Sequence, residues 1–325
     1  MPTSKMKTLH QYRILVVGGC GFIGSHIVQS LQRLGHEVWT IDNINTYHNS
    51  LDINLLWKAV AERTQGFKKD NINKSITDNL SEEFEMIKPQ IVINLAAYPS
   101  VKLVEQYKQD ALQVMGAGLI NLLELCKKYQ VEKYIYFSSS MVYGNWTKSK
   151  MSEWDATNPI NLYGNLKLFG EKLNTLYDMH VYNIRPCAVY GPGDYSNRVL
   201  NQFCLNAQQD KPLIIHGKNT RIDFTYVADV VSAVEKMIDN TRFGWDNTFN
   251  ITGGCARLLT DVAEKIEELS GKKLDIRILE KDKSQPKRGV FTLDKAYNFL
   301  HWQPLTTFNH GLKSLYDWTY KFYQH

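Results

Sequence analysis

The sequence predicts an α/β fold in which a doubly wound parallel sheet is followed by a smaller C-terminal lobe. Short apolar runs alternate with helical patterns over the first half of the chain, as βαβ units require. A glycine-rich turn joins the first run to the first helical segment. Past about residue 190 the alternation gives way to a loop and shorter elements. We therefore place a nucleotide-binding domain at 1–190 and a substrate-binding lobe at 191–325, and expect 223–245 to rejoin the first domain.

Five nearly continuous apolar runs are the expected strands. Such runs are typical of parallel strands that helices cover on both faces. The expected strands are 12–18, 36–42, 90–97, 132–139 and 181–190.

Three helical segments are expected between these strands. Residues 22–33 begin directly after the glycine turn, and 103–129 carry apolar residues at helical spacing. The third segment, 160–177, follows Pro159. The pattern therefore supplies a helix after most of the expected strands.

Composition and charge limit the possible functions. The 325 residues are 43% hydrophobic and 22% charged, and the net charge of +5 is mild. Because the sequence lacks a dense Lys/Arg block, we expect no nucleic-acid partner, whereas a small anionic substrate suits the weak positive bias. The five cysteines are widely spaced and form no zinc-ligand pattern, so we expect no metal and a reducing compartment. The polar N-terminus and the lack of a long apolar run predict a cytoplasmic protein without a membrane partner.

The glycine turn predicts a dinucleotide site. Gly18, Gly21 and Gly24 follow the spacing GxxGxxG between a strand and a helix, which lets the backbone and the helix terminus approach a pyrophosphate. Asp42 ends the next strand, where its carboxylate can accept hydrogen bonds from both ribose hydroxyls and repel the 2′-phosphate of NADP. The pattern favours NAD over NADP. The alternative is a strand-end aspartate that only caps a turn.

Tyr163 and Lys167 are the candidate proton-transfer pair. Residues four apart on a helix share a face, so both side chains can point into one cleft. A free tyrosine has a pKa near ~10, and a nearby ammonium together with the positive charge of an oxidised nicotinamide would lower that pKa. Tyr163 could then take a hydroxyl proton while hydride leaves the same carbon for NAD. The alternative is a packed tyrosine and a solvated lysine.

Taken together, these motifs resemble the extended short-chain dehydrogenase/reductase family, the NAD-dependent nucleotide-sugar epimerases and dehydratases. The resemblance covers nearly the whole chain, and the motifs come in the family's order and spacing. The matching stretches are "ILVVGGCGFIGSH", "VINLAA", "FSSSMVYG", "YGNLK", "IRPCAVYGPGD", "RIDFTYVADVV" and "FNITGG".

The resemblance implies a modified Rossmann domain that keeps NAD bound and a C-terminal lobe that holds a nucleoside diphosphate sugar. It also implies a homodimer through helices near 103–128 and 160–178. The first reaction step shared by the family is oxidation of the sugar, usually at C4. In this sequence Ser139 matches the family's catalytic Ser/Thr, which would hydrogen-bond the reacting hydroxyl and Tyr163, with Lys167 completing the set.

The resemblance also implies two sets of binding residues. The cofactor positions are Gly18, Gly21, Phe22, Ile23, Gly24, Asp42, Asn43, Asp70, Leu95, Ala96, Ala97, Tyr163, Lys167 and Pro186. The expected substrate contacts are Ser140, Met141, Arg198, Arg221 and Arg288.

Several positions depart from the family pattern. The 4,6-dehydratases carry two acids after the catalytic Ser/Thr, whereas this chain has Ser140 and Met141, and a thioether cannot transfer the protons of dehydration. Ala188 replaces an asparagine that contacts the diphosphate, and Arg221 is displaced by one residue from its usual place. Met115 stands where the family often has asparagine near the cofactor. These differences predict a rearranged diphosphate site.

Three functions follow, in order of preference. The first is a nucleotide-sugar 4-epimerase, which oxidises C4 with NAD and returns the hydride to the opposite face. The second is a nucleotide-sugar 4-dehydrogenase that stops at the 4-keto sugar and NADH. The third is a non-catalytic NAD-binding sensor or scaffold, against which the complete set of Ser139, Tyr163 and Lys167 argues.

Overall fold

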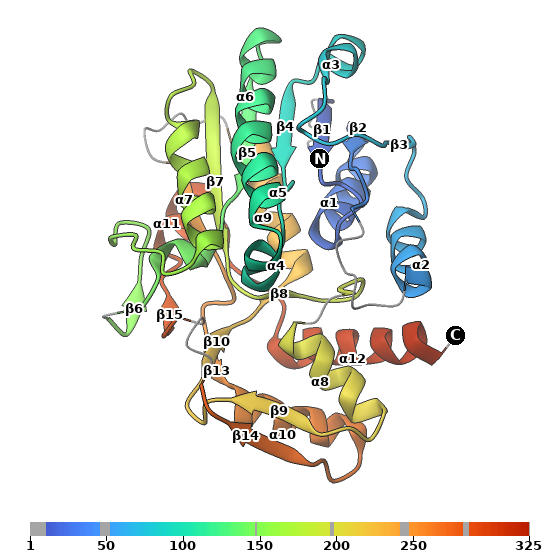
Figure 1. Ribbon diagram of the computed structural model, residues 1–325, viewed down its shortest axis with the longest axis vertical. Coiled ribbons are helices and arrows are strands. Elements are labelled where there is room, and N and C mark those ends of the chain that lie inside the picture. The colour runs from blue at the N-terminus through green and yellow to red at the C-terminus, as the bar shows by residue number, and fades with distance from the viewer. Residues whose placement is uncertain are drawn as a thin grey trace, which may run out of the picture.

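A computed structural model describes residues 11–45, 53–146, 148–195, 198–240, 247–281 and 286–324. A parallel sheet with helices on both faces forms the upper part of the molecule in Figure 1, and a smaller group of helices and short strands lies below it. The α/β fold with a doubly wound parallel sheet is confirmed.

Seven parallel strands build the central sheet. Their order is β12-β7-β5-β4-β1-β2-β3. From β1 the chain first builds the sheet outward to β3 at one edge, and it then returns to add β4, β5, β7 and β12 on the other side of β1. The adjacent strands β1 and β4 are paired from Ile14 with Ile91 to Val17 with Asn94. The strands are β1 (Arg13–Val17), β2 (Glu37–Ile41), β3 (Asn71–Ile72), β4 (Ile91–Asn94), β5 (Lys133–Phe137), β7 (His180–Pro186) and β12 (Thr248–Ile251).

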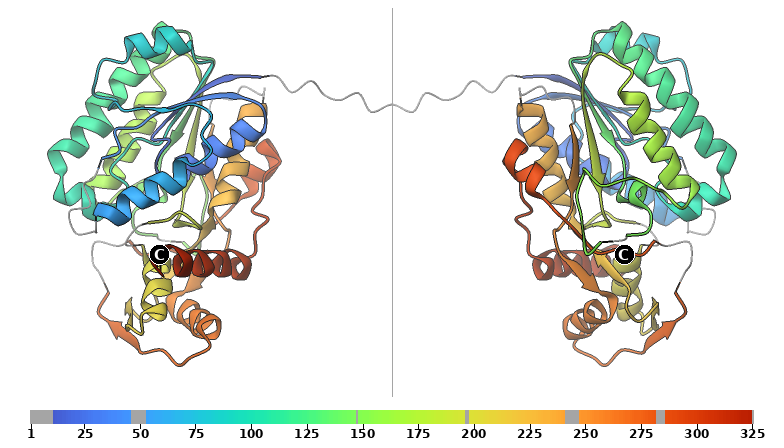
Figure 2. Two further views of the ribbon diagram at one scale, coloured as in Figure 1. Left: turned by 90° about the vertical axis from the view of Figure 1, so that its right-hand side faces the viewer. Right: turned by 90° about the vertical axis from the view of Figure 1, so that its left-hand side faces the viewer.

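Helices cover both faces of this sheet, as Figure 2 shows. On one face, apolar residues of α1 (Phe22–Arg33), α9 (Val227–Asp239) and α11 (Asp294–Leu300) pack with the strands in one buried cluster. On the other, α3 (Ser81–Ile87) and α6 (Leu119–Lys128) supply the second cluster. Burial on both faces explains why the central strands are almost wholly apolar.

The helical segment predicted at 103–129 is four consecutive pieces. They are α4 (Val101–Gln106), α5 (Lys108–Leu112), a π-helical turn η1 (Gln113–Gly118) and α6. Alongside them lies α7 (Leu162–Asn174). The π turn contains Met115, which is buried against Tyr163 and Leu166. Wider π turns occur often at functional sites.

The lower part of the molecule has its own apolar cluster, built mainly from α8 (Val199–Gln208), α10 (Leu259–Ser270) and α12 (Phe308–Gln324). Two-stranded sheets complete it. They pair β9 (Leu213–His216) with β14 (Ile276–Leu279) and β10 (Arg221–Asp223) with β13 (Ala256–Leu258).

Two further short pairings join distant parts of the chain. β8 (Val189–Tyr190) pairs with β11 (Thr225–Tyr226), and β6 (Lys150–Met151) pairs with β15 (Val290–Phe291). The division at residue 190 stays a prediction, and β12 and α11, from the later half of the chain, pack with the central sheet.

Candidate active site

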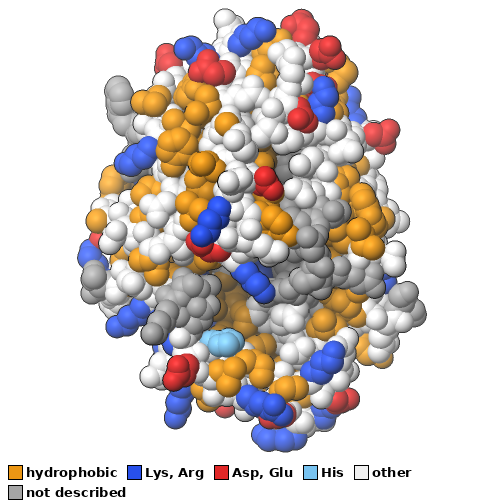
Figure 3. All heavy atoms as spheres, viewed as in Figure 1, with side chains coloured by type: hydrophobic (Ala, Val, Ile, Leu, Met, Phe, Trp, Pro, Cys, Tyr) orange, Lys and Arg blue, Asp and Glu red, His pale blue; other side chains and the backbone are white. Residues whose placement is uncertain are grey.

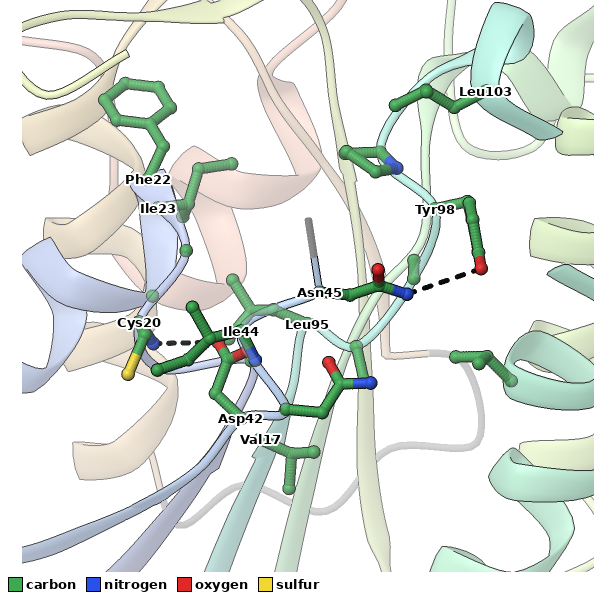
Figure 4. Close-up of a pocket in the computed structure, with 18 of the residues that line it drawn as sticks. Val17, Cys20, Phe22, Ile23, Asp42, Ile44, Asn45, Leu95, Tyr98 and Leu103 are labelled. Atoms are coloured by element: carbon green, nitrogen blue, oxygen red, sulfur yellow. Dashed lines mark hydrogen bonds between the residues drawn. The ribbon is translucent and has the colours of Figure 1, made fainter. Parts of the chain in front are cut away.

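A cleft of about 690 Å³ opens at the carboxyl ends of β1, β2 and β4. This is the edge where ligands bind in open α/β sheets. Figure 4 shows the glycine turn with Phe22 and Ile23 on one side and Tyr98 and Leu103 on the other. Of the expected cofactor positions, those lining the cleft are Gly18, Gly21, Phe22, Ile23, Gly24, Asp42, Asn43, Leu95, Ala96 and Ala97.

The glycine turn fits a dinucleotide phosphate because it has no room for side chains. A Cβ atom at Gly24 would lie 2.2 Å from the Gly18 carbonyl oxygen. Gly18 has φ +81° and lies against the backbone of Leu95 and Ala96. The turn leads directly into α1, whose N-terminus carries a positive dipole end. The bare backbone and the helix terminus are therefore available together to an anion.

Asp42 lies at the other side of this turn. Its Oδ2 accepts a hydrogen bond from the Cys20 backbone N–H at 3.0 Å, and its Oδ1 accepts one from Ile44 at 2.8 Å. Burial raises the pKa of the Asp42 carboxyl, against these hydrogen bonds and the charge of Arg63. Asp42 thus braces the glycine turn, and it also lines the cleft where a ribose would lie.

The three candidate catalytic residues meet at the end of β5. Ser139 begins the 3-10 turn η2 (Ser140–Tyr143), where its hydroxyl accepts a hydrogen bond from the Met141 N–H, and it is also hydrogen-bonded to Tyr163. Lys167, one turn beyond Tyr163 on α7, lies with its Nζ 6.0 Å from the centre of the tyrosine ring. That Nζ donates to the Phe137 carbonyl at 2.6 Å.

The pKa shifts of Tyr163 and Lys167 differ from the expectation that a charged Lys167 lowers the pKa of Tyr163. Burial raises the pKa of the Tyr163 phenol, opposed by the hydrogen bond with Ser139 and by the charges of Arg198 and Arg288. Burial also lowers the pKa of Lys167 to about 7, with Glu171 opposing it. Because Lys167 is only 3% exposed, the desolvation of its ammonium group outweighs the opposing charge of Glu171.

This burial predicts a pH-dependent stability that Lys167→Met removes. The lysine pKa is about 7 in the fold and near ~10.4 in the unfolded chain, so folding releases a proton between these values. The free energy of unfolding should therefore rise with pH across this window, by up to about 1.4 kcal/mol per pH unit, relative to Lys167→Met. Urea unfolding of both proteins without ligand at pH 7.5 and 9 measures it. If the free energies of unfolding of the two proteins change with pH in parallel, the lowered pKa of Lys167 is contradicted.

A buried charged network lies next to the candidate catalytic residues. Arg185 donates from Nε and Nη2 to the two oxygens of Glu171 at 2.9 and 2.7 Å, and from Nη1 to the Tyr143 hydroxyl at 2.9 Å. Ser138 donates to the same Glu171 at 2.5 Å. Sequence reasoning missed this network. The one available signal was the position of Glu171, four residues after Lys167 on the same helix face.

The expected substrate side of the site contains sulfur and arginine. Arg288 donates from Nη2 to the Met141 sulfur at 2.9 Å and contacts the Cys187 sulfur at 3.8 Å. Ser140 is hydrogen-bonded to Cys187. The structure therefore brings Ser140, Met141 and Arg288 together next to Ser139, the candidate catalytic serine.

The remaining expected site residues lie farther apart. Arg198 lines the cleft and lies over the Phe22 ring, 5.9 Å from its centre, whereas Arg221 is exposed on β10. Asp70 is exposed and is not among the residues that line the cleft, and its neighbour Asn71 instead donates to the Asp42 carbonyl at 2.8 Å. Pro186, at the end of β7, lies outside the lining, as do Tyr163 and Lys167.

Sequence reasoning also missed one side of the cleft. Leu56, Val60 and Arg63 of α2 (Ile53–Thr64) line it together with Asp194 and Tyr195. No motif marks these residues, because α2 contacts the loop at 191–195 only through the tertiary fold. Among the described residues there is no group of three or more His, Cys, Asp or Glu side chains placed to hold a metal ion.

Comparisons with known proteins agree with this geometry. The NAD dependent epimerase/dehydratase family matches residues 14–252. UDP-glucuronic acid 4-epimerase from Bacillus cereus, solved with UDP-glucuronic acid and NAD, superposes with a TM-score of 0.86 at 26% identity, covering 95% of this chain and 99% of that one. UDP-glucose 4-epimerase from Thermotoga maritima, solved with UDP-glucose, gives 0.84 at 27%, covering 95% and 98%. UDP-glucuronate 4-epimerase 1 of Arabidopsis thaliana is 28% identical over 95% of this chain and 77% of its own.

Proposed function

This chain belongs to the NAD dependent epimerase/dehydratase family, and we propose on that premise that it is a nucleotide-sugar 4-epimerase. The observation that carries the proposal is the meeting of Ser139, Tyr163 and Lys167, where Tyr163 packs in one apolar cluster with residues that line the dinucleotide cleft. The solved relatives at 26% and 27% identity act on UDP-glucuronic acid and UDP-glucose, so a UDP-sugar is the substrate class to test first.

In the proposed reaction Ser139 orients the C4 hydroxyl, and Tyr163 takes its proton and later returns it. NAD accepts the hydride of C4 and gives it back to the other face of the keto sugar. Arg198 and Arg288 supply positive charge near the phenolate, Lys167 adds to it when it is protonated, and the hydrogen bond between Ser139 and Tyr163 supports this arrangement. Met141 places a thioether where elimination would need an acid, which disfavours dehydration.

A substrate panel tests the proposal. The purified protein is incubated with UDP-, GDP-, CDP- and dTDP-sugars, including UDP-glucose and UDP-glucuronic acid, while product identity and NADH absorbance are followed. We expect a C4 epimer with no net change in NAD. A keto sugar formed in step with NADH would identify the dehydrogenase instead. Absence of turnover with every sugar, together with bound NAD, would favour the non-catalytic alternative.

We propose that the protein is a homodimer through α5, α6 and α7. Four exposed apolar side chains lie on or directly after these helices: Leu112, Ile120, Phe169 and Leu176. Figure 3 shows apolar side chains gathered along this part of the surface. Such a patch is typical of an interface between protein chains.

Phe169→Glu is expected to convert the dimer to a monomer, because a charge would be buried in the interface. Sedimentation velocity measures the assembly. Leu305→Glu is the matched control, since Leu305 is 78% exposed outside these helices. A monomeric unmodified protein, or a dimer of Phe169→Glu, would contradict the proposed interface.

We also propose a cytoplasmic location, supported by the cysteines. Cys20, Cys126, Cys187 and Cys204 are buried and free, and Cys255 is exposed and free, as suits a reducing compartment. In the described part of the chain, no helix has the length and apolar character needed to span a membrane.

A further inference from the structure

The helix α2 packs against residues from the later half of the chain. Its buried residues are Leu56, Ala59 and Val60. Leu56 and Ala59 pack with Tyr195 and with Phe322 near the end of α12 in one apolar cluster. Figure 1 shows α2 directly above the C-terminal end of α12. Because α2 lines the cofactor cleft, this packing closes one side of the cleft with residues from both ends of the chain.

Hydrogen bonds hold the same contact. Lys58 donates from Nζ to the Phe322 carbonyl at 2.5 Å, and the ring nitrogen of Trp318 donates to Glu62 at 2.5 Å. The Trp318 ring also stacks on Phe322, with 4.7 Å between ring centres. Two hydrogen bonds therefore tie α2 to α12, and the ring stack within α12 orders the two residues that take part in them.

Arg63, near the C-terminal end of α2, binds a second segment from the later half of the chain. It donates from Nε and Nη2 to the Gly193 carbonyl at 2.8 and 2.6 Å, which fixes the loop at 191–195 to α2. From the other side, His26 of α1 is hydrogen-bonded to the Pro192 carbonyl at 2.9 Å. The loop is therefore held from two helices of the nucleotide-binding half.

The loop at 191–195 lies next to the glycine turn. Gly193 has φ +83°, and a Cβ atom there would lie 3.8 Å from the Phe22 ring, which directly follows Gly21. The charge of Arg63 also acts on Cys20 and Asp42, at the two sides of the same turn. A dinucleotide phosphate on the turn would thus lie next to the guanidinium.

We propose that α2, the loop 191–195 and the end of α12 form a clasp that sets how long NAD stays bound, with Arg63 as its central residue. The inference rests on the proposed function and deepens it. An epimerase must keep the same cofactor between removing and returning the hydride, whereas a dehydrogenase must exchange NADH for NAD. The clasp favours the epimerase, because opening it would break the hydrogen bonds of Arg63, Lys58 and Trp318 together.

Cofactor release without sugar tests the clasp. NADH is bound to the purified protein, and its fluorescence is followed after mixing with excess NAD. We expect Arg63→Ala to release NADH at least tenfold faster, and Arg63→Lys and Trp318→Phe to release it faster by smaller factors. Arg277→Ala is the matched control, because Arg277 pairs with Asp275 on exposed β14 and should not change the rate.

Release of NADH from Arg63→Ala within twofold of the unmodified rate would overturn the clasp. If Arg63→Ala does not fold, Arg63→Lys and Trp318→Phe decide the matter by the same criterion, with melting curves of the unliganded proteins confirming that each is folded. Since no sugar is present, failure of the clasp is distinguishable from failure of the epimerase proposal, which the substrate panel reports separately.

Discussion

Tyr163→Phe is expected to lower sugar turnover at least ~100-fold, because proton transfer by a positioned side chain contributes about 10²–10⁴-fold to a rate. The substitution removes only the phenolic oxygen, which is hydrogen-bonded to Ser139 and feels the charges of Arg198 and Arg288. The ring remains to pack beside Met115 and Leu166. Turnover of the active sugar, measured alongside NAD content, reports the effect.

The control for this prediction is Tyr107→Phe. Tyr107 packs with the same apolar cluster as Tyr163, and its hydroxyl accepts a hydrogen bond from Gln106 at 3.1 Å. It should keep nearly full activity. Unchanged turnover in Tyr163→Phe would rule out the proton transfer that we assign to this residue.

Arg185→Met is expected to destabilise the protein by about 3–5 kcal/mol, the cost of leaving one partner of a buried ion pair without compensation. Arg185 is 6% exposed and Glu171 is 5% exposed, so the buried carboxylate would lose both hydrogen bonds from the guanidinium and keep Ser138 as a donor. Urea unfolding at pH 7.5 measures the loss of free energy.

The double variant Arg185→Met with Glu171→Gln serves as the matched comparison. It removes both charges and should recover part of the stability, since neutral groups cost less to bury than a lone carboxylate. A loss below about 1 kcal/mol for Arg185→Met alone would contradict a tightly coupled pair.

The sequence predicts the parts of this fold that depend on short-range patterns. The helix expected at 22–33 is α1, and the expected strand at 132–139 contains β5. Apolar runs and a glycine turn are local signals, so these elements are readable. The two-residue strand β3 and the four-residue edge strand β12 were not expected, because strands this short leave little periodicity in the sequence.

The candidate site also contains residues that the sequence predicts and residues that it does not. Motif spacing leads to Ser139, Tyr163 and Lys167, which lie together in the structure. Arg63 and Arg185 carry no motif, since each meets its partner only after distant segments fold together. Asp70 is the opposite case, because its position in the sequence resembles a cofactor contact while its side chain is exposed.

The central sheet is completed by the edge strand β12, which is synthesised late in the chain. β12 pairs with β7 between Thr248 and Ile251, and α9 and α11 cover the same face of the sheet. The nucleotide-binding half therefore cannot complete its sheet on the ribosome until most of the polypeptide has emerged. A chain truncated near residue 190 would expose an open strand edge and an uncovered apolar face, and we expect it to aggregate rather than fold as a separate unit.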